Sequence, residues 1–170
     1  LRAGWPMGLR SITGELWPAS PMDESIRQKD LVIVNPPLAF FTIASPLIWA
    51  CDDQPLPRHL RTLTSSCYQP VEICRTDANT LDISPDVGYV AGAMDGLFRT
   101  EKHPLTLGQV IQLPGMTVTI TAIHANQRVT EAAFRFDVPL EDSSLYWLQW
   151  KDKRFVPFTP PAIGETVILK

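Results

Sequence analysis

The apolar and polar residues of this chain alternate in short runs broken by proline and glycine, a pattern typical of a fold built mostly of strands. The clearest case is residues 109–113 and 116–123, which flank a Pro-Gly pair and predict a hairpin. Alternation along the second of these segments predicts one polar face, with three threonines, and one buried face. The side chains expected on the buried face are those of Met116, Val118, Ile120 and Ala122.

Other segments predict further strands. Residues 71–74 and 80–84 flank a polar turn and predict a second hairpin. Beyond residue 124, three more strands are expected at 131–138, at 146–150 and at 154–158, and a last one within 159–170. Together with the hairpin of 109–123, the strands expected beyond residue 124 predict an antiparallel sheet, sandwich or small barrel of about five or six strands.

The amino-terminal side has a different pattern. Residues 31–51 contain no charged side chain, and a run of that length is long enough to cross a bilayer. Leu31 to Val34 predicts a strand, and Pro36 interrupts the backbone donors, which leaves 38–51 as a helix of about 21 Å, short of a hydrocarbon core of about 30 Å. We therefore expect a buried helix that leads to a second strand within 59–66. The alternative is a segment that lies on a membrane surface.

These patterns predict an α+β, mainly β fold, in which a short βα(β) unit is followed by an antiparallel β-sandwich or small barrel. The chain length allows one substantial core or two small subdomains that share an interface. We expect a linker or juxtamembrane segment at 1–29, a βα-containing subdomain with a hairpin at 30–96, and an antiparallel β subdomain at 97–170.

Charge narrows the classes of partner. The chain carries 15 Lys and Arg against 18 Asp and Glu, which gives a formal net charge of −3. Nucleic-acid binding requires clustered cations to neutralise phosphates. The densest basic spot, formed by Arg58, His59 and Arg61, is more typical of a solvated strand end than of a phosphate site. No nucleic-acid partner is expected.

The sequence contains no motif for covalent or metal chemistry. Cys51, Cys67 and Cys74 are spaced neither as a zinc ribbon nor as a redox pair, which leaves open either one disulfide or three thiols. The histidines form no i,i+4 pair, and no serine lies in a glycine-flanked elbow. We predict no catalytic residue, no metal and no cofactor.

Two places are candidates for binding. Tyr146 and Trp150 share one face of a strand and Trp147 lies on the other, so at least one large ring is expected to be open to a carbohydrate, a peptide or another part of the parent protein. Packing in the core is the commoner fate of such rings. Asn35 is the second candidate, because open α/β sheets bind ligands at the carboxyl ends of their strands.

The chain resembles the carboxy-terminal soluble region of a group of uncharacterised bacterial polytopic membrane proteins. The residues that carry the resemblance are DLVIVNPP, VEICRTDANTLDI, GLFRTEKHPLTLGQVIQLPGMTVTI, AAFRFDVPLEDSSLYWLQW and FVPFTPPAIGE. In that group the region follows a bundle of membrane helices. The resemblance implies a juxtamembrane linker at 1–29, a domain outside the cytoplasm, periplasmic or at the cell surface, and a membrane tether outside this chain. It implies no activity.

We therefore expect a non-catalytic accessory domain of a membrane protein that binds a partner protein, a glycan or an envelope component. The alternative is an enzyme or small-ligand receptor with a site near Asn35, with His59 or Asp52 nearby. A concave site that joins Asn35 to a titratable group with a shifted pKa would favour the alternative.

Overall fold

The structure is a computed structural model that describes residues 23–37, 39–64, 69–89, 104–125 and 127–170. The fold is α+β and mainly β, with two sheets and one α-helix among these residues. In chain order the elements are the 3-10 helix η1 (Glu24–Gln28), β1 (Asp30–Ile33), α2 (Ala39–Cys51), β2 (His59–Thr62), β3 (Val71–Arg75), β4 (Thr80–Pro85), β5 (Val110–Leu113), β6 (Met116–Ile123), β7 (Val129–Phe136), β8 (Leu145–Lys151), β9 (Arg154–Pro157) and β10 (Thr166–Leu169). Most of the expected linker, Cys67 and residues 90–103 lie outside the described residues.

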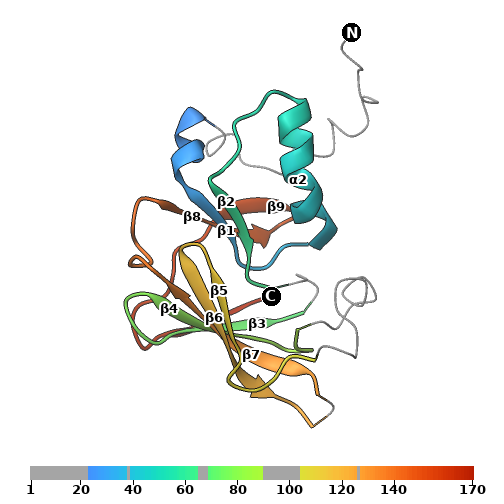
Figure 1. The fold of residues 1–170 in the computed structure, drawn as a ribbon, viewed down its shortest axis with the longest axis vertical. Coiled ribbons are helices and arrows are strands. Elements are labelled where there is room, and N and C mark those ends of the chain that lie inside the picture. The colour runs from blue at the N-terminus through green and yellow to red at the C-terminus, as the bar shows by residue number, and fades with distance from the viewer. Residues whose placement is uncertain (1–22, 38, 65–68, 90–103, 126) are drawn as a thin grey trace.

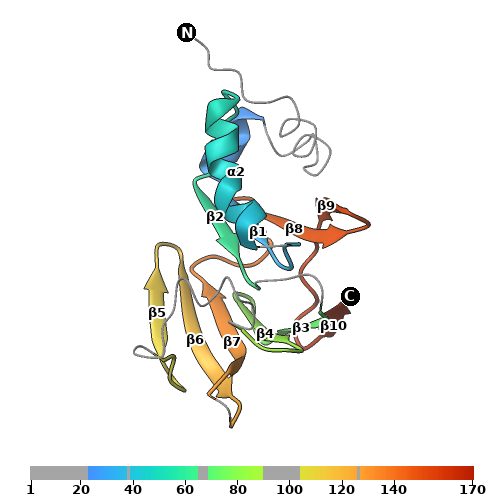
Figure 2. The ribbon, with the colours of Figure 1, turned by 90° about the vertical axis from the view of Figure 1, so that its right-hand side faces the viewer.

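Sheet A contains four strands in the order β2-β1-β8-β9. Strand β1 is parallel to both β2 and β8, and β8 is antiparallel to β9. Helix α2 connects β1 to β2 and lies beside sheet A, on the side away from the second sheet (Figures 1 and 2). The predicted βα(β) unit is confirmed. All four residues of β1 are buried, as expected for a parallel strand covered on both faces.

The described side chains of α2 confirm that one side of the helix is covered. Trp49 is 5% exposed and packs with Leu31, Ile33 and Leu148 of sheet A. Leu47 lies on the opposite side and is 60% exposed. Because Trp49 is packed against the sheet, its ring is not available to anchor the helix in lipid.

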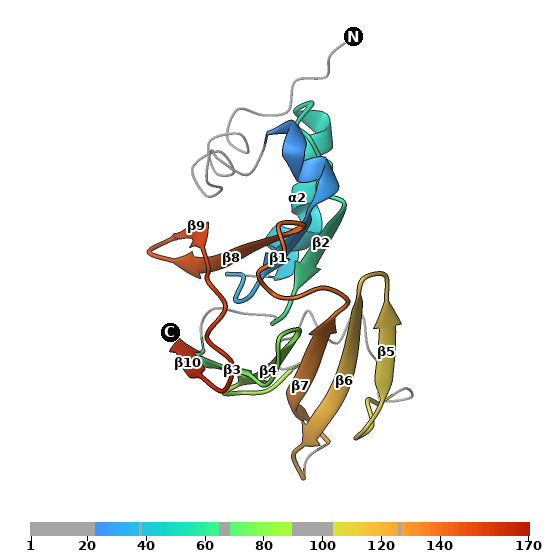
Figure 3. The same ribbon diagram turned by 90° about the vertical axis from the view of Figure 1, so that its left-hand side faces the viewer.

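Sheet B contains six antiparallel strands in the order β10-β3-β4-β7-β6-β5 (Figure 3). Both predicted hairpins, β3–β4 and β5–β6, are present. Along β3 the side chains alternate as predicted, with Val71 and Ile73 buried and Glu72 exposed. One face of sheet B therefore packs on the core and the other, the outer face, meets solvent.

The partners of β8 and β9 differ from the expectation. Both strands were predicted to belong to the antiparallel assembly, but β8 pairs in parallel with β1, and β9 follows it into sheet A. In the antiparallel sheet, the place expected for β8 and β9 is taken by β3 and β4, because β4 pairs with β7. Both sheets thus combine strands from either side of residue 96, and parallel pairing of this range leaves no local signal in a sequence.

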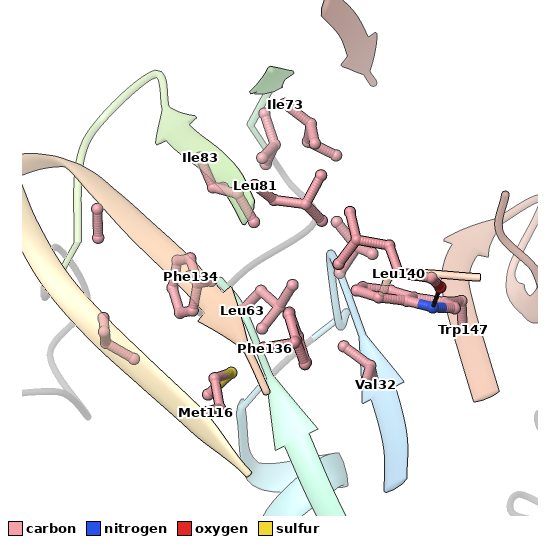
Figure 4. Close-up of a cluster of buried hydrophobic side chains, with 14 of the residues drawn as sticks. Val32, Leu63, Ile73, Leu81, Ile83, Met116, Phe134, Phe136, Leu140 and Trp147 are labelled. Atoms are coloured by element: carbon pink, nitrogen blue, oxygen red, sulfur yellow. Dashed lines mark hydrogen bonds between the residues drawn. The ribbon is translucent and has the colours of Figure 1, made fainter. Parts of the chain in front are cut away.

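The main core lies between the two sheets. Val32 of β1, Leu63 and Trp147 of β8 face Ile73, Leu81, Phe134 and other buried side chains of sheet B (Figure 4). A smaller cluster lies on the other face of sheet A, under α2. The molecule therefore has three layers, helix, sheet A and sheet B, of which sheet B is covered by described elements on one face alone.

The end of β6 departs from the predicted alternation. Met116, Val118 and Ile120 are buried as predicted. The prediction that Ala122 shares their face was wrong, because the register of β6 on β7 shifts after Ile120 and Ala122 comes to lie opposite Glu131. An irregularity of this kind adds a residue to one strand and re-aims the side chains that follow.

Arg75 fixes the position of the carboxyl-terminal strand. Its guanidinium donates to the carbonyl oxygens of Asp77, Ala78 and Pro161 at 3.0–3.1 Å and to both carboxylate oxygens of Glu141. This hydrogen bonding to Arg75 lowers the pKa of Glu141. The backbone of Arg75 also binds the segment just before β10, at Gly164 and Glu165. These bonds bring β10 alongside β3 at the edge of sheet B.

Candidate functional site

Asn35 lies directly beyond β1 and is 2% exposed. Its side-chain oxygen accepts from the backbone N–H of Trp150 at 2.8 Å, and its side-chain nitrogen donates to the Trp150 carbonyl at 3.2 Å. The amide thus extends the pairing of β1 with β8 by one more step, after Val34 has donated to the Leu148 carbonyl at 3.0 Å. Both ends of the Asn35 side chain are engaged by the protein itself.

The three aromatic candidates divide between the two faces of sheet A, as the alternation predicted. Trp147 is 7% exposed and lies between the sheets, where its indole N–H donates to the Leu140 carbonyl at 2.8 Å. Its ring centroid is 5.2 Å from that of Phe136 (Figure 4). Tyr146 and Trp150 are half-buried on the helix side, and Trp150 packs edge-on against Phe155. A binding role for these rings stays a prediction.

The basic spot is an ion-pair cluster around a buried carboxylate. Asp30 is 3% exposed, and one of its oxygens accepts from Arg58 Nε at 2.7 Å and lies 2.9 Å from His59 Nδ1. Its other oxygen is 3.7 Å from Arg61 Nη2, which also donates to the carbonyl of Pro114 in the β5–β6 turn. These side chains join β1 and β2 to sheet B. The expectation of a solvated strand end holds for Arg58, whereas Arg61 is buried.

A groove on the outer face of sheet B is the candidate binding site. It encloses about 380 Å³ and is open to solvent on one side. Its lining comes from strands β3, β4, β6, β7 and β10, from the residue before β3 and from the residue after β4. The lining residues are Pro70, Glu72, Ser84, Pro85, Asp86, Ala122, Thr130, Glu131 and Ile168. Strands from both halves of the chain build it, and Ala122 reaches it through the register shift in β6.

Glu131 is held in place at one side of the groove. One carboxylate oxygen accepts from Thr121 Oγ1 of β6 at 2.7 Å, and the other accepts from Ser84 Oγ of β4 at 3.2 Å. Two neighbouring strands therefore orient this carboxylate before any ligand arrives. A group that is already ordered loses less conformational freedom on binding.

The groove has a negative electrostatic character. Its lining carries three carboxylates, those of Glu72, Asp86 and Glu131, and no Lys, Arg or His among the described residues. Asp82 lies on the same face of β4 as Ser84. Burial raises the pKa of Asp82, and the charges of Glu131 and Asp77 raise it further. A positively charged ligand would relieve this repulsion between carboxylates.

The alternation of β3, β4 and β7 could have indicated that Glu72, Ser84 and Glu131 point to the polar face, but nothing local shows that these strands are neighbours. The groove was therefore missed by sequence reasoning. Within the described part of the chain, no group of His, Cys, Asp and Glu could hold a metal ion. The cysteines described, Cys51 and Cys74, are free thiols. No helix among the described residues is long and apolar enough to cross a membrane.

The fold and the groove define an α+β, mainly β domain in which two sheets pack face to face and one of them presents a concave acidic surface. No family model, no curated protein and no solved structure matches this chain. The contacts and charges of the groove are accordingly the basis for a functional hypothesis.

Proposed function

We propose that this chain is a non-catalytic interaction domain that binds a positively charged, extended segment of a partner protein in the groove on the outer face of sheet B. The observation that carries the proposal is the groove itself, which combines about 380 Å³ of concave space with three carboxylates and no cationic side chain among its described lining. Charge complementarity of this kind selects partners and speeds association.

The uncharged part of the lining suits a peptide chain. Pro70, Pro85 and Ile168 supply an apolar wall, and Ile168 is 57% exposed. Lys and Arg side chains bury their methylene stems against such surface while the charged group reaches a carboxylate. Thr130 also lines the groove, and a threonine hydroxyl can donate to or accept from polar groups of a peptide.

A glycan matches the groove less well than a peptide. The hypothesis of a glycan ligand depended on an open aromatic ring, and the described lining residues include no aromatic side chain. The enzyme alternative depended on a site at Asn35. Both ends of the Asn35 amide bind the backbone of Trp150, and this residue is buried, so its contacts favour a structural role.

The resemblance noted above extends the proposal to the whole protein. It implies an accessory domain outside the cytoplasm, periplasmic or at the cell surface, held by a membrane tether that lies outside this chain. The groove would then face partner segments in the same compartment. Digestion of the domain by added protease in cells with an opened envelope, but with an intact inner membrane, tests this location. Protection from the protease would contradict it.

The binding experiment uses two labelled probes of equal length. Fluorescence anisotropy is measured with a fluorescein-labelled peptide of alternating Lys and Val and with a matched peptide of alternating Glu and Val. We expect the Lys peptide to bind and the Glu peptide not to bind, and we expect added salt to weaken binding because it screens exposed charges. Equal binding of both peptides, or of neither, contradicts the proposal.

Variants locate the site. Glu131→Gln removes the charge but keeps one acceptor oxygen for Thr121 or Ser84, and its NH2 group can donate to the other hydroxyl. We expect it to weaken binding about fivefold, since a partly exposed ion pair contributes up to about 1 kcal/mol. Asp152→Asn, in the exposed β8–β9 turn, changes the net charge by the same amount away from the groove. It should leave the affinity unchanged. Equal losses in both variants would mean that overall charge, and not the groove, attracts the peptide.

A further inference from the structure

Glu131 lies in a row of side chains that crosses sheet B from β10 to β6 along the groove. Register places Ile168 of β10 opposite Glu72 of β3, and Glu72 opposite Ser84 of β4. Ser84 donates to Glu131 of β7, and Glu131 lies opposite Ala122 of β6. Because its two neighbours in this row, Ser84 and Ala122, are small, they leave the Glu131 carboxylate accessible from the groove.

The two hydroxyl groups that bind Glu131 fix the plane of its carboxylate. The last torsion of a glutamate side chain is otherwise broad. Thr121 Oγ1 of β6 donates to one oxygen at 2.7 Å and Ser84 Oγ of β4 donates to the other at 3.2 Å, so the carboxylate is held from both sides of β7. An ionised carboxylate has about four lone-pair sites on its two oxygens, so about one site on each oxygen remains for a ligand.

Two acceptors side by side in a fixed plane match the guanidinium group of arginine. A guanidinium presents two parallel N–H groups in a rigid plane, whereas a lysine ammonium is a point charge and gains little from the orientation of the carboxylate. Arg75 and Glu141 of this chain form such a pair, in which one guanidinium donates to both carboxylate oxygens.

Hydration favours arginine as well. Glu131 is half-buried, so a cation that reaches it gives up part of its water shell. A guanidinium is more weakly hydrated than an ammonium, and it therefore loses less on entering the groove.

We propose that Glu131 makes the groove selective for arginine over lysine, because one arginine of the partner segment donates two parallel hydrogen bonds to its carboxylate. This inference rests on the proposed function, since it requires that a cationic segment binds in the groove. Glu72 has a different role. It is exposed, and no hydrogen bond joins its carboxylate to another described residue, so its charge should attract lysine and arginine alike.

A pair of peptides tests the selectivity. Fluorescence anisotropy compares the labelled peptide of alternating Lys and Val with a peptide of alternating Arg and Val of the same length and charge. We expect the Arg peptide to bind about fivefold more tightly. Equal binding of the two peptides would reject this inference and leave the proposed function standing. Failure of both peptides to bind would reject the proposed function and this inference with it.

Two variants of the groove assign the selectivity to one carboxylate. Glu131→Gln places an NH2 group where one acceptor oxygen stood, so a guanidinium meets a second donor, and we expect the preference for the Arg peptide to fall to about onefold. Glu72→Gln is the matched control, because it removes one charge from the same groove. It should weaken both peptides equally and keep the preference. A preference that persists in Glu131→Gln, or that disappears in Glu72→Gln, would overturn the proposal.

The double variant Thr121→Val, Ser84→Ala tests the fixed plane. It keeps the charge of Glu131 but removes both hydroxyl groups that orient the carboxylate. We expect the affinity for the Lys peptide to stay unchanged and the preference for the Arg peptide to fall by about half or more, because the carboxylate must then be ordered on binding. Thermal unfolding shows whether the variant keeps the native fold. A full preference in the folded double variant would contradict selection by an oriented carboxylate.

Discussion

Sheets A and B are built from strands of similar length but have different surroundings. Sheet A lies between α2 and sheet B, so β1 is buried at every residue. Sheet B packs on the core through one face, and β3 alternates between buried and open side chains. The comparison shows why the polar side chains of sheet A, such as Asn35, serve the fold, whereas those of the outer face of sheet B can meet a ligand.

The largest effect is expected where the two sheets meet. Trp147→Ala removes a buried ring that contacts Phe136 and leaves the Leu140 carbonyl without its indole donor. Replacing a buried aromatic residue by Ala typically costs about 3–5 kcal/mol of stability. Unfolding in urea measures the loss.

Trp150→Ala sharpens this comparison. Trp150 lies on the same strand but is half-buried on the helix side of sheet A. Its substitution should cost less than that of Trp147. Equal losses of stability would show that packing under α2 contributes as much to the free energy of unfolding as packing between the two sheets.

A smaller effect is expected at the end of β1. Asn35→Ala removes the side-chain partner of the N–H and of the C=O of Trp150 in a partly buried position, which should cost about 2 kcal/mol. Asn79→Ala is the control, because Asn79 is half-buried and donates one side-chain bond, to the Phe136 carbonyl at 3.1 Å. Urea unfolding should show a smaller loss for Asn79→Ala. An Asn35→Ala protein as stable as the parent would mean that the amide is dispensable for the fold, and would revive a ligand-binding role.

The smallest effect, and the opposite sign, is expected on the outer face of sheet B. Burial, and then the charges of Glu131 and Asp77, raise the pKa of Asp82 above its ordinary value of 3.8. The folded protein therefore holds the Asp82 proton more tightly than the unfolded chain. Ionisation of Asp82 destabilises the fold, and this cost is absent below both pKa values and complete above the folded one.

Asp82→Asn should therefore raise the melting temperature slightly at pH 7 and leave it unchanged at a pH below 3.8. Thermal unfolding at both pH values checks this, with Asp152→Asn in the exposed turn as the control. An equal gain in melting temperature at both pH values would show that ionisation of Asp82 does not destabilise the fold.

Local patterns were sufficient for most elements of this fold. Alternation and turn residues predicted β3 with β4 and β5 with β6, because a short polar turn joins the first pair and a Pro-Gly turn joins the second. Pro36 and the charge-free run predicted β1 and α2. The prediction failed at Ala122, since an extra residue in β6 breaks the period of two.

The candidate sites show the same division. Alternation placed Trp147 opposite Tyr146 and Trp150, but it could not tell which face of the strand would meet the second sheet. Glu72 and Glu131 were readable as polar-face residues. Their presence in one groove depends on the order β3-β4-β7, which joins segments about 60 residues apart.

The amino-acid sequence by itself determined the mainly β character and the positions of the hairpins and the helix, because these depend on neighbours within a few residues. The parallel pairing of β1 with β8, the burial of Asn35 and Trp147 and the acidic groove arise when distant strands become neighbours. That choice depends on which apolar faces can be buried together, which is a property of the whole chain.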